Sequence, residues 1–268
     1  MKRPRYIDWF VEENGIRIKE NIPLKCYKVD YKDDEDILDE WALHIRRNYI
    51  DDEELKEDAD LNGMSIEQYL YEYIIPQKAE HLGPTARSAD IAEILVADLL
   101  EFIMGYTVPR FKLKNRSGKN NSQQGTDVIA YKYKNSDKSP SNKDELIAAE
   151  VKATLSSNQY TPLENAIIDS HKDEHRLARS INYCRKRLNE LGKSSEANEI
   201  KRFLFKPDNN YKITYAAAGI SSREDVDEVI ELSVSGEELE IRNGEKIFYV
   251  HGERLMELTH NIYERCRK

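Results

Sequence analysis

The sequence contains no long uninterrupted run of apolar residues. Its longest apolar stretch, residues 91–106, is broken by three acidic side chains, whereas a transmembrane helix needs about 20 consecutive apolar residues. The basic N-terminus, MKRPRYIDWFVEE, lacks the apolar segment of a secretory signal peptide. We therefore expect a cytoplasmic protein without a membrane partner.

Cysteine is also scarce. The three cysteines, Cys26, Cys184 and Cys266, lie far apart and form no CxxC pair. Zinc sites and disulfide frameworks are recognised in a sequence by closely spaced cysteines. The spacing therefore predicts neither a structural zinc site nor a disulfide framework, and it favours a reducing compartment.

The 268-residue chain has an excess of acid, with a formal net charge of −9. That charge alone argues against nucleic-acid binding, but it is unevenly distributed. Residues 110–206 contain 20 Lys and Arg against 12 Asp and Glu, whereas residues 30–60 contain 4 against 14 and residues 221–260 contain 4 against 11. Because local basic patches bind polyanions, the middle of the chain is a candidate binding region. Solvated charged faces are the alternative interpretation.

Apolar periodicity predicts a layered α/β domain with a mixed sheet. Two strands stand out, GTDVIAYKY at residues 125–133 and ELIAAEVKATL at residues 145–155, and the second is apolar enough to lie inside a sheet. A third strand is expected at residues 211–220. The other expected strands lie within residues 15–29, 108–113, 228–234 and 247–250, and the expected helices are residues 34–47, 64–75, 88–104, 163–191 (one helix or two) and 252–267.

The pattern changes near residue 85, which suggests two parts. Residues 1–85 are expected to form an acidic, mostly helical module, in which residues 51–60 are a solvated acidic run. Residues 86–268 hold the strong strands and are expected to form the second domain. The segment HLGPTAR, residues 81–87, would be the turn or linker between them.

The most informative feature is a set of charged residues inside the two strong strands. Asp127 lies in the first, and Glu150-Val151-Lys152 lies in the second. Because residues two apart on a strand point to the same face, Glu150 and Lys152 project together and Val151 projects to the opposite, buried face. If the strands are neighbours, the Asp127 carboxylate lies beside Glu150, and paired carboxylates suit Mg²⁺ or Mn²⁺. A lysine beside them can activate a water and stabilise charge developing on a phosphoryl group.

The (D/E)xK pattern occurs four times in this highly charged chain. Only Glu150-Val151-Lys152 lies in an apolar strand, where a charged pair is unfavourable unless it has partners. Two interpretations remain open, a metal-binding catalytic site and a structural ion pair between Glu150 and Lys152. Glu93, in the helix expected at residues 88–104, is a candidate third acid that either joins the site or faces solvent.

Basic residues of the middle region are candidate phosphate contacts, with a solvated basic loop as the alternative. His171 and His175 lie four apart on a predicted helix, but HKDEH is not HExxH and no third zinc ligand is evident. No P-loop, GxGxxG or GxSxG motif is present, so we expect no nucleotide bound by this chain. The candidate nucleic-acid-binding residues are Lys112, Lys114, Arg116, Lys119, Arg176 and Arg179.

A helix with a glutamate, a strand with an aspartate and a strand with ExK, in this order, resemble the PD-(D/E)xK nuclease superfamily, although Gly125-Thr126-Asp127 replaces the usual Pro-Asp. A narrower resemblance extends over about residues 38–265, to HamA, the nuclease subunit of the Hachiman anti-phage defence system. The segments that carry it are RSADIAEILVADLLEFIMGYTVPR, GTDVIAYK, DELIAAEVKATLS, ENAIIDSHKD, YAAAGI and GERLMELTHNIYERC.

The resemblance implies a restriction-endonuclease-like fold, in which helices flank a mixed central sheet. It also implies a Mg²⁺-dependent (or Mn²⁺-dependent) endonuclease that cleaves DNA with little sequence specificity when a superfamily 2 helicase, HamB-like and encoded nearby, releases it. The catalytic residues carried over by position are Glu93, Asp127, Glu150 and Lys152. Val151 joins the three acids as a predicted metal ligand.

The acidic module, residues 1–85, is then a candidate docking surface for the helicase or a regulator of DNA entry. Two other functions remain open. A non-catalytic DNA-binding or adaptor subunit would bind DNA without metal, and a conventional restriction endonuclease would yield discrete fragments.

Overall fold

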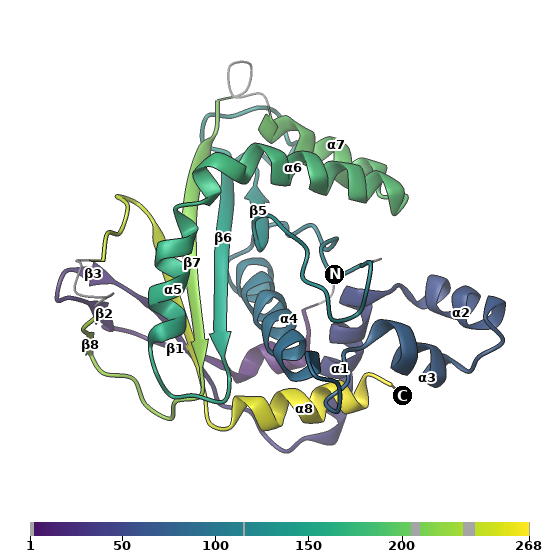
Figure 1. Cartoon of the computed structure of the whole chain (residues 1–268). Helices are drawn as coiled ribbons and strands as arrows, with labels where there is room; N and C mark the ends of the chain where they lie inside the picture. Colours follow the sequence, from purple (N-terminus) through teal and green to yellow (C-terminus); the bar gives the residue numbers. More distant parts are fainter. Residues whose placement is uncertain (1–2, 115, 205–209, 233–238, 268) are drawn as a thin grey trace.

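A computed structural model shows an α/β fold built on one six-stranded mixed sheet (Figure 1). It describes residues 3–114, 116–204, 210–232 and 239–267. The strands of this sheet are β1 Phe10–Glu13, β4 Lys25–Val29, β5 Val128–Lys132, β6 Glu145–Thr154, β7 Lys212–Ser221 and β9 Lys246–His251. Their order is β1-β4-β9-β7-β6-β5, with the four inner strands parallel and the two edge strands antiparallel to their neighbours. The expected mixed α/β fold is confirmed.

Helices cover both faces of this sheet (Figure 1). One face packs against α1 Glu35–Tyr49, α4 Gly83–Asp98 and α8 Leu255–Arg265, and the other against α5 Thr161–Ser170, α6 Asp173–Glu190 and α7 Ser194–Lys201. The alternation along β6 follows from this arrangement. Ile147 and Val151 lie in the core under α4, whereas Leu146 and Ala148 lie in the core under α6.

Shorter elements complete the described chain. They are the 3-10 helices η1 Arg5–Trp9 and η4 Arg202–Leu204, the π-helical turns η2 Leu70–Ile74 and η3 Leu99–Ile103, the helices α2 Asp52–Leu61 and α3 Ile66–Tyr69, and the strands β2 Arg17–Ile18, β3 Ile22–Pro23 and β8 Val229–Ile230. The three short strands form a second small sheet, in the order β3-β2-β8. Among the described residues no helix is long and apolar enough to span a bilayer.

Two expected elements differ in kind from those observed. Residues 108–113 form no strand, and one isolated bridge joins Thr107 to Tyr131 nearby; Pro109 has no N–H with which to continue a ladder. The acidic residues of the run 51–60 are exposed or partly exposed, as expected, but most of the run belongs to a helix that was not expected, α2, whose Leu55 and Ala59 are buried. Their four-residue spacing is one helical turn, which the many acids around them obscured.

Other differences concern boundaries. α4 begins at Gly83 in the segment expected as a linker, with Pro84 in its first turn, where a missing N–H removes no hydrogen bond. The segment 163–191 forms two helices, α5 and α6, and α7 was not expected at all. The strand expected at 228–234 is observed as β8 over two residues, and residues 233 and 234 lie outside the described chain.

The N-terminal segment shares the core of the rest of the chain. β1 and β4 belong to the main sheet, and side chains of α1 such as Trp41 and Ile45 lie in the same apolar cluster as Leu95 of α4 and Ile262 of α8. The two expected parts therefore share an apolar cluster, and a division into domains at residues 85 and 86 stays a prediction. A separate function for residues 1–85 stays a prediction.

Candidate active site

Strand pairing brings Asp127 next to the end of β6. β5 and β6 are antiparallel, with Val128 opposite Ala149. Asp127 immediately precedes β5, so the same register carries it to the level of Glu150. One Asp127 carboxylate oxygen accepts a hydrogen bond of 2.9 Å from the backbone N–H of Val151. The charged residues of the two strong strands thus meet in the fold.

Glu150 and Lys152 lie on the same side of β6 and contact each other. The Lys152 ammonium is 2.7 Å from one Glu150 carboxylate oxygen and 3.1 Å from Asp169 at the end of α5. Arg176 of α6 contacts the other Glu150 oxygen, and its Nε lies 2.7 Å from Asp173. Two cations and two further acids from α5 and α6 therefore fix the position of Glu150, which is buried.

Glu93 reaches the site from α4, through a shared cation. The Lys112 ammonium donates hydrogen bonds of 2.9 Å to Glu93 and 2.7 Å to Asp127. The Lys112 side chain is 10% exposed, and the two carboxylate side chains are 14% and 15% exposed. One nearly buried ammonium thus joins the helix carboxylate to the strand carboxylate.

Burial disfavours the ionised forms of three acids in and beside the site. Burial raises the pKa of Glu93 to about 8, and the neighbouring Asp127 adds to the shift, which Lys112 opposes. Burial, together with Asp127, also raises the pKa of Glu150. Burial raises the pKa of Asp173 as well, and its Oδ2 finds no hydrogen-bond partner among the described residues. Added positive charge would stabilise the ionised form of each of these acids.

A groove of about 510 Å³ opens beside the site. Glu93, Asp127 and Lys152 line it, together with small side chains of α4, the end of β6 and two side chains of α8. Glu150 is not among the lining residues and lies behind Lys152. The groove therefore exposes two acids and one lysine of the predicted set to a ligand.

The donor set fits a hard divalent cation. Mg²⁺ and Mn²⁺ prefer carboxylate oxygens, and the oxygens of Glu93 and Asp127 already surround one positively charged nitrogen. A metal ion between these two acids would replace the Lys112 ammonium. The backbone N–H of Val151 orients Asp127, and the role of Val151 as a ligand stays a prediction.

Five of the six basic residues predicted to contact DNA have carboxylate partners within the protein. Lys112 bridges Glu93 and Asp127, as described above. The other partners are Asp51 for Lys114, Asp90 for Arg116, Glu80 for Lys119, and Glu150 and Asp173 for Arg176. Arg179 is exposed on α6. Contact of these six residues with DNA stays a prediction, and four of them brace the segment 112–119 against other elements.

Sequence reasoning missed two acids of the site, Asp169 and Asp173. His171 and His175 of the same segment have the spacing of zinc ligands but lack the motif; His175 is exposed, whereas Asp173 is fully buried. The available signal was the pair of aspartates four residues apart beside a basic helix. The role of Lys112 as a bridge between two acids had no signal, because it depends on the path of an irregular segment.

A protein-family model described as HamA matches residues 4–266, which is nearly the whole chain. The matched range includes the acidic N-terminal residues as well as every residue of the site. No curated protein matches the chain.

Proposed function

The chain belongs to the HamA family and is thus a subunit of a Hachiman defence system, and we propose that it acts there as a metal-dependent deoxyribonuclease. The proposed substrate is the phosphodiester backbone of DNA, cleaved internally and with little sequence preference. The proposed partner is the superfamily 2 helicase of the same system, which controls when the nuclease acts.

One observation carries this proposal. Three charged residues from different parts of the chain, Glu93, Asp127 and Lys152, line one groove, and the Lys152 ammonium contacts Glu150 at 2.7 Å. A purely structural ion pair between Glu150 and Lys152 would not require a further acid from α4, Glu93, whose pKa burial raises to about 8. A strongly perturbed acid that lines a groove is typical of a functional site.

The metal would supply a Lewis acid that polarises the scissile phosphate and lowers the pKa of the attacking water. Asp127, Glu150 and Glu93 would hold it. Lys152 would position the water and stabilise the charge that develops on the phosphoryl oxygens. Asp169 would keep the Lys152 ammonium beside the groove, since it contacts that group at 3.1 Å.

Lys112 has a separate role in this proposal. Its ammonium lies between Glu93 and Asp127, where it offsets part of their negative charge in the absence of metal. It would leave that position when a divalent cation binds, since both cannot share the same oxygens. The two acids would therefore be held together by Lys112 before the metal arrives.

The test compares wild type with Lys152→Ala on supercoiled DNA, in the presence of the helicase partner and Mg²⁺ or Mn²⁺. We expect metal-dependent cleavage by wild type, and a rate lower by about a thousandfold in the variant, because charge stabilisation in a transition state is worth several kcal/mol. Lys201→Ala is a matched control. Lys201 ends another ExK segment, Glu199-Ile200-Lys201, but it is exposed on α7, so this variant should cleave DNA like wild type.

Equal cleavage by Lys152→Ala and wild type would contradict the proposal. A lower melting temperature for Lys152→Ala with unchanged cleavage would favour the structural ion pair. If no condition gives cleavage, a phage-protection assay with Lys152→Ala distinguishes the nuclease from the adaptor. Protection that survives the substitution supports the adaptor function, and protection that is lost supports the nuclease.

A further inference from the structure

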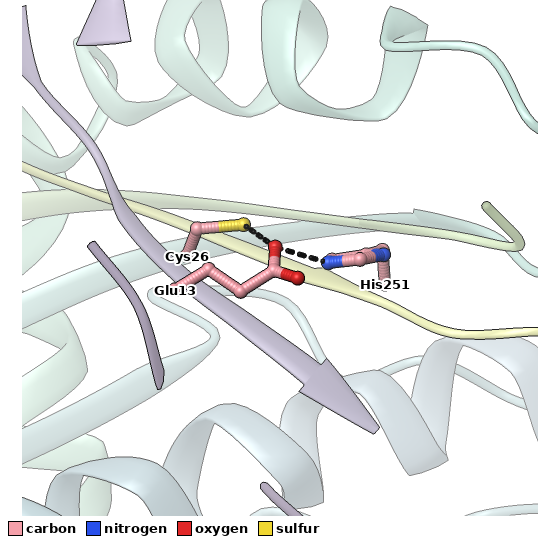
Figure 2. Close-up of side chains that lie close together, drawn as sticks. All are labelled: Glu13, Cys26 and His251. Atoms are coloured by element: carbon pink, nitrogen blue, oxygen red, sulfur yellow. Dashed lines mark hydrogen bonds and ion pairs between the residues drawn. The ribbon is translucent and has the colours of Figure 1, made fainter. Parts of the chain in front are cut away.

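A second cluster of potential metal ligands lies on the opposite half of the sheet. Glu13 at the end of β1, Cys26 in β4 and His251 at the end of β9 converge there (Figure 2). Their carboxylate, thiol and imidazole donor atoms all lie within 4.8 Å of one another. It is the one such group of three or more His, Cys, Asp or Glu donors among the described residues.

Two of the three donors point at the same oxygen atom. His251 Nε2 lies 2.8 Å from Glu13 Oε2, and Cys26 Sγ lies 3.5 Å from the same oxygen. Metal–ligand bonds of about 2.0–2.3 Å in a tetrahedral zinc site separate neighbouring ligand atoms by about 3.3–3.8 Å. Small side-chain movements would therefore place all three donors around one ion.

The imidazole of His251 is held in the orientation that metal binding requires. Its Nδ1 lies 3.0 Å from the carbonyl oxygen of Arg223, and since a carbonyl accepts only, Nδ1 carries the hydrogen. Nε2 is thereby left with its lone pair toward the cluster whenever the ring is neutral. Histidines that bind metals usually donate their second N–H to a carbonyl or a carboxylate in this way. The ring also lies parallel to that of Tyr249, 6.1 Å away.

The cluster is largely closed to solvent. Cys26 and His251 are fully buried, and the Glu13 side chain is 31% exposed. Burial, reinforced by the Glu13 carboxylate, raises the pKa of the Cys26 thiol well above its ordinary value. Lys28, paired in register with His251, extends instead toward Asp225 at 4.0 Å. Of the three side chains, Glu13 is the one that solvent reaches.

We propose that Glu13, Cys26 and His251 form a zinc site with a water molecule as the fourth ligand. Thiolate, imidazole and carboxylate together match Zn²⁺ better than Mg²⁺, which prefers oxygen ligands alone. Binding displaces the thiol proton to solvent, so that a zinc–sulfur bond replaces the S–H bond. This inference goes beyond the proposed nuclease function and doesn't depend on it.

The site would fasten the edge of the sheet. β1 is an edge strand of four residues that pairs with β4 alone. A metal held by β1, β4 and β9 would connect this edge to the parallel strands of the centre. Its ligands lie on three strands that are distinct from β6, which holds Glu150 and Lys152, and from β5, which Asp127 immediately precedes. The proposed zinc would therefore stabilise this edge of the sheet and lie apart from the candidate nuclease residues.

The experiment uses the full chain, purified without added chelator, and measures its bound metals by elemental analysis. After removal of metal it is titrated with Co²⁺, a spectroscopic substitute for Zn²⁺. We expect one tightly bound zinc per chain, and a thiolate-to-cobalt charge-transfer band with the visible bands of tetrahedral Co²⁺. A hundredfold excess of Zn²⁺ over its Kd should raise the melting temperature by about 5–10 °C.

Cys26→Ser removes the thiolate with the smallest change in shape, and the charge-transfer band should disappear. Cys184→Ser is the matched control, because Cys184 is equally buried but lies in the core under α6. That variant should keep both the band and the zinc. His251→Gln should weaken zinc binding by about a hundredfold or more, which also covers the case in which Cys26→Ser does not fold.

A wild-type chain with neither bound zinc nor a thiolate band would overturn the proposal. A band that survives in Cys26→Ser would overturn it as well. The three residues would then be a closed hydrogen-bond cluster. Neither metal content nor the cobalt spectrum involves DNA cleavage. The zinc proposal can therefore be tested even if the proposed nuclease function is wrong.

Discussion

Two acids of helix α4, Glu93 and Asp98, lie five residues apart and differ in the direction in which their pKa values are shifted. Burial raises the pKa of Glu93 to about 8. The pKa of Asp98 is lowered, although burial by itself would raise it, because the charges of His44 and Arg110 outweigh the burial. The helix places both side chains in the interior, so their different behaviour comes from their partners.

The Asp98 carboxylate has three side-chain partners. Arg110 lies 2.7 Å from it, His44 lies 3.0 Å from it, and the Tyr6 hydroxyl donates a hydrogen bond of 2.7 Å. Glu93, in contrast, contacts one ammonium, which it shares with Asp127. A buried acid with complete partners stabilises the fold. A buried acid with too few partners has the capacity to bind a further cation, which is typical of a functional site.

The strongest test of this comparison is Arg110→Met. Arg110 is 10% exposed and also contacts Glu101 at 2.6 Å, so its loss leaves two acids without their main partner. We expect the free energy of unfolding to fall by about 3–5 kcal/mol, as measured by urea denaturation. Mg²⁺ should not restore the loss, and restoration would show that the Asp98 cluster is also a cation site.

Asp98→Asn tests the same cluster through pH. Because the pKa of Asp98 is lowered in the folded state, its contribution is present above its unfolded value of about 3.9 and is lost as pH falls below that value. We expect the variant to be less stable than wild type by about 2–3 kcal/mol at pH 7. The difference should narrow in melting curves below about pH 4. A constant difference between pH 7 and pH 3 would contradict this interpretation.

Lys112→Met tests the cluster at the other end of the helix. With chelator present, we expect a loss of about 1–2 kcal/mol, smaller than for Arg110→Met because Glu93 can take up a proton. Mg²⁺ should restore most of the loss by occupying the position of the ammonium. If Mg²⁺ has no effect on the melting temperature, Glu93 and Asp127 do not bind it together.

Glu93→Gln should have the smallest effect on stability. The neutral amide resembles the protonated acid that burial favours, so the free energy of unfolding should change by less than about 1 kcal/mol. DNA cleavage should nevertheless decrease, because one metal ligand is lost. The pair of variants Glu93→Gln and Asp98→Asn therefore separates an acid kept for function from an acid kept for stability. Equal destabilisation of both would remove the distinction.

Local sequence patterns predicted the elements that hold the site. The apolar runs around Asp127 and Glu150 predicted β5 and β6, and the alternation of a strand predicted that Glu150 and Lys152 share a face. These predictions depend on residues adjacent in the chain. The expected strand at 108–113 was wrong because Val108 and Phe111 lie in the core without a strand. Burial alone therefore does not predict hydrogen-bonded pairing.

The remaining partners of the site were not predictable in the same way. Lys112 reaches Glu93 and Asp127 because an irregular segment crosses between α4 and β5, and no periodic pattern describes such a path. Asp169 near the end of α5 and Asp173 at the start of α6 contact Lys152 and Arg176, respectively, which both contact Glu150. In sequence these acids resemble ordinary solvated residues of a charged helix.

By itself the sequence determined the α/β class, the two strong strands and the ExK segment, because secondary structure follows from side chains within a few residues of one another. Only the tertiary structure decided which buried acid has enough partners and where Glu13, Cys26 and His251 meet. Glu13 and His251 are 238 residues apart in the chain and come into contact across paired strands. Such contacts depend on strand order and register, which close loops between distant segments and leave no local pattern in the sequence.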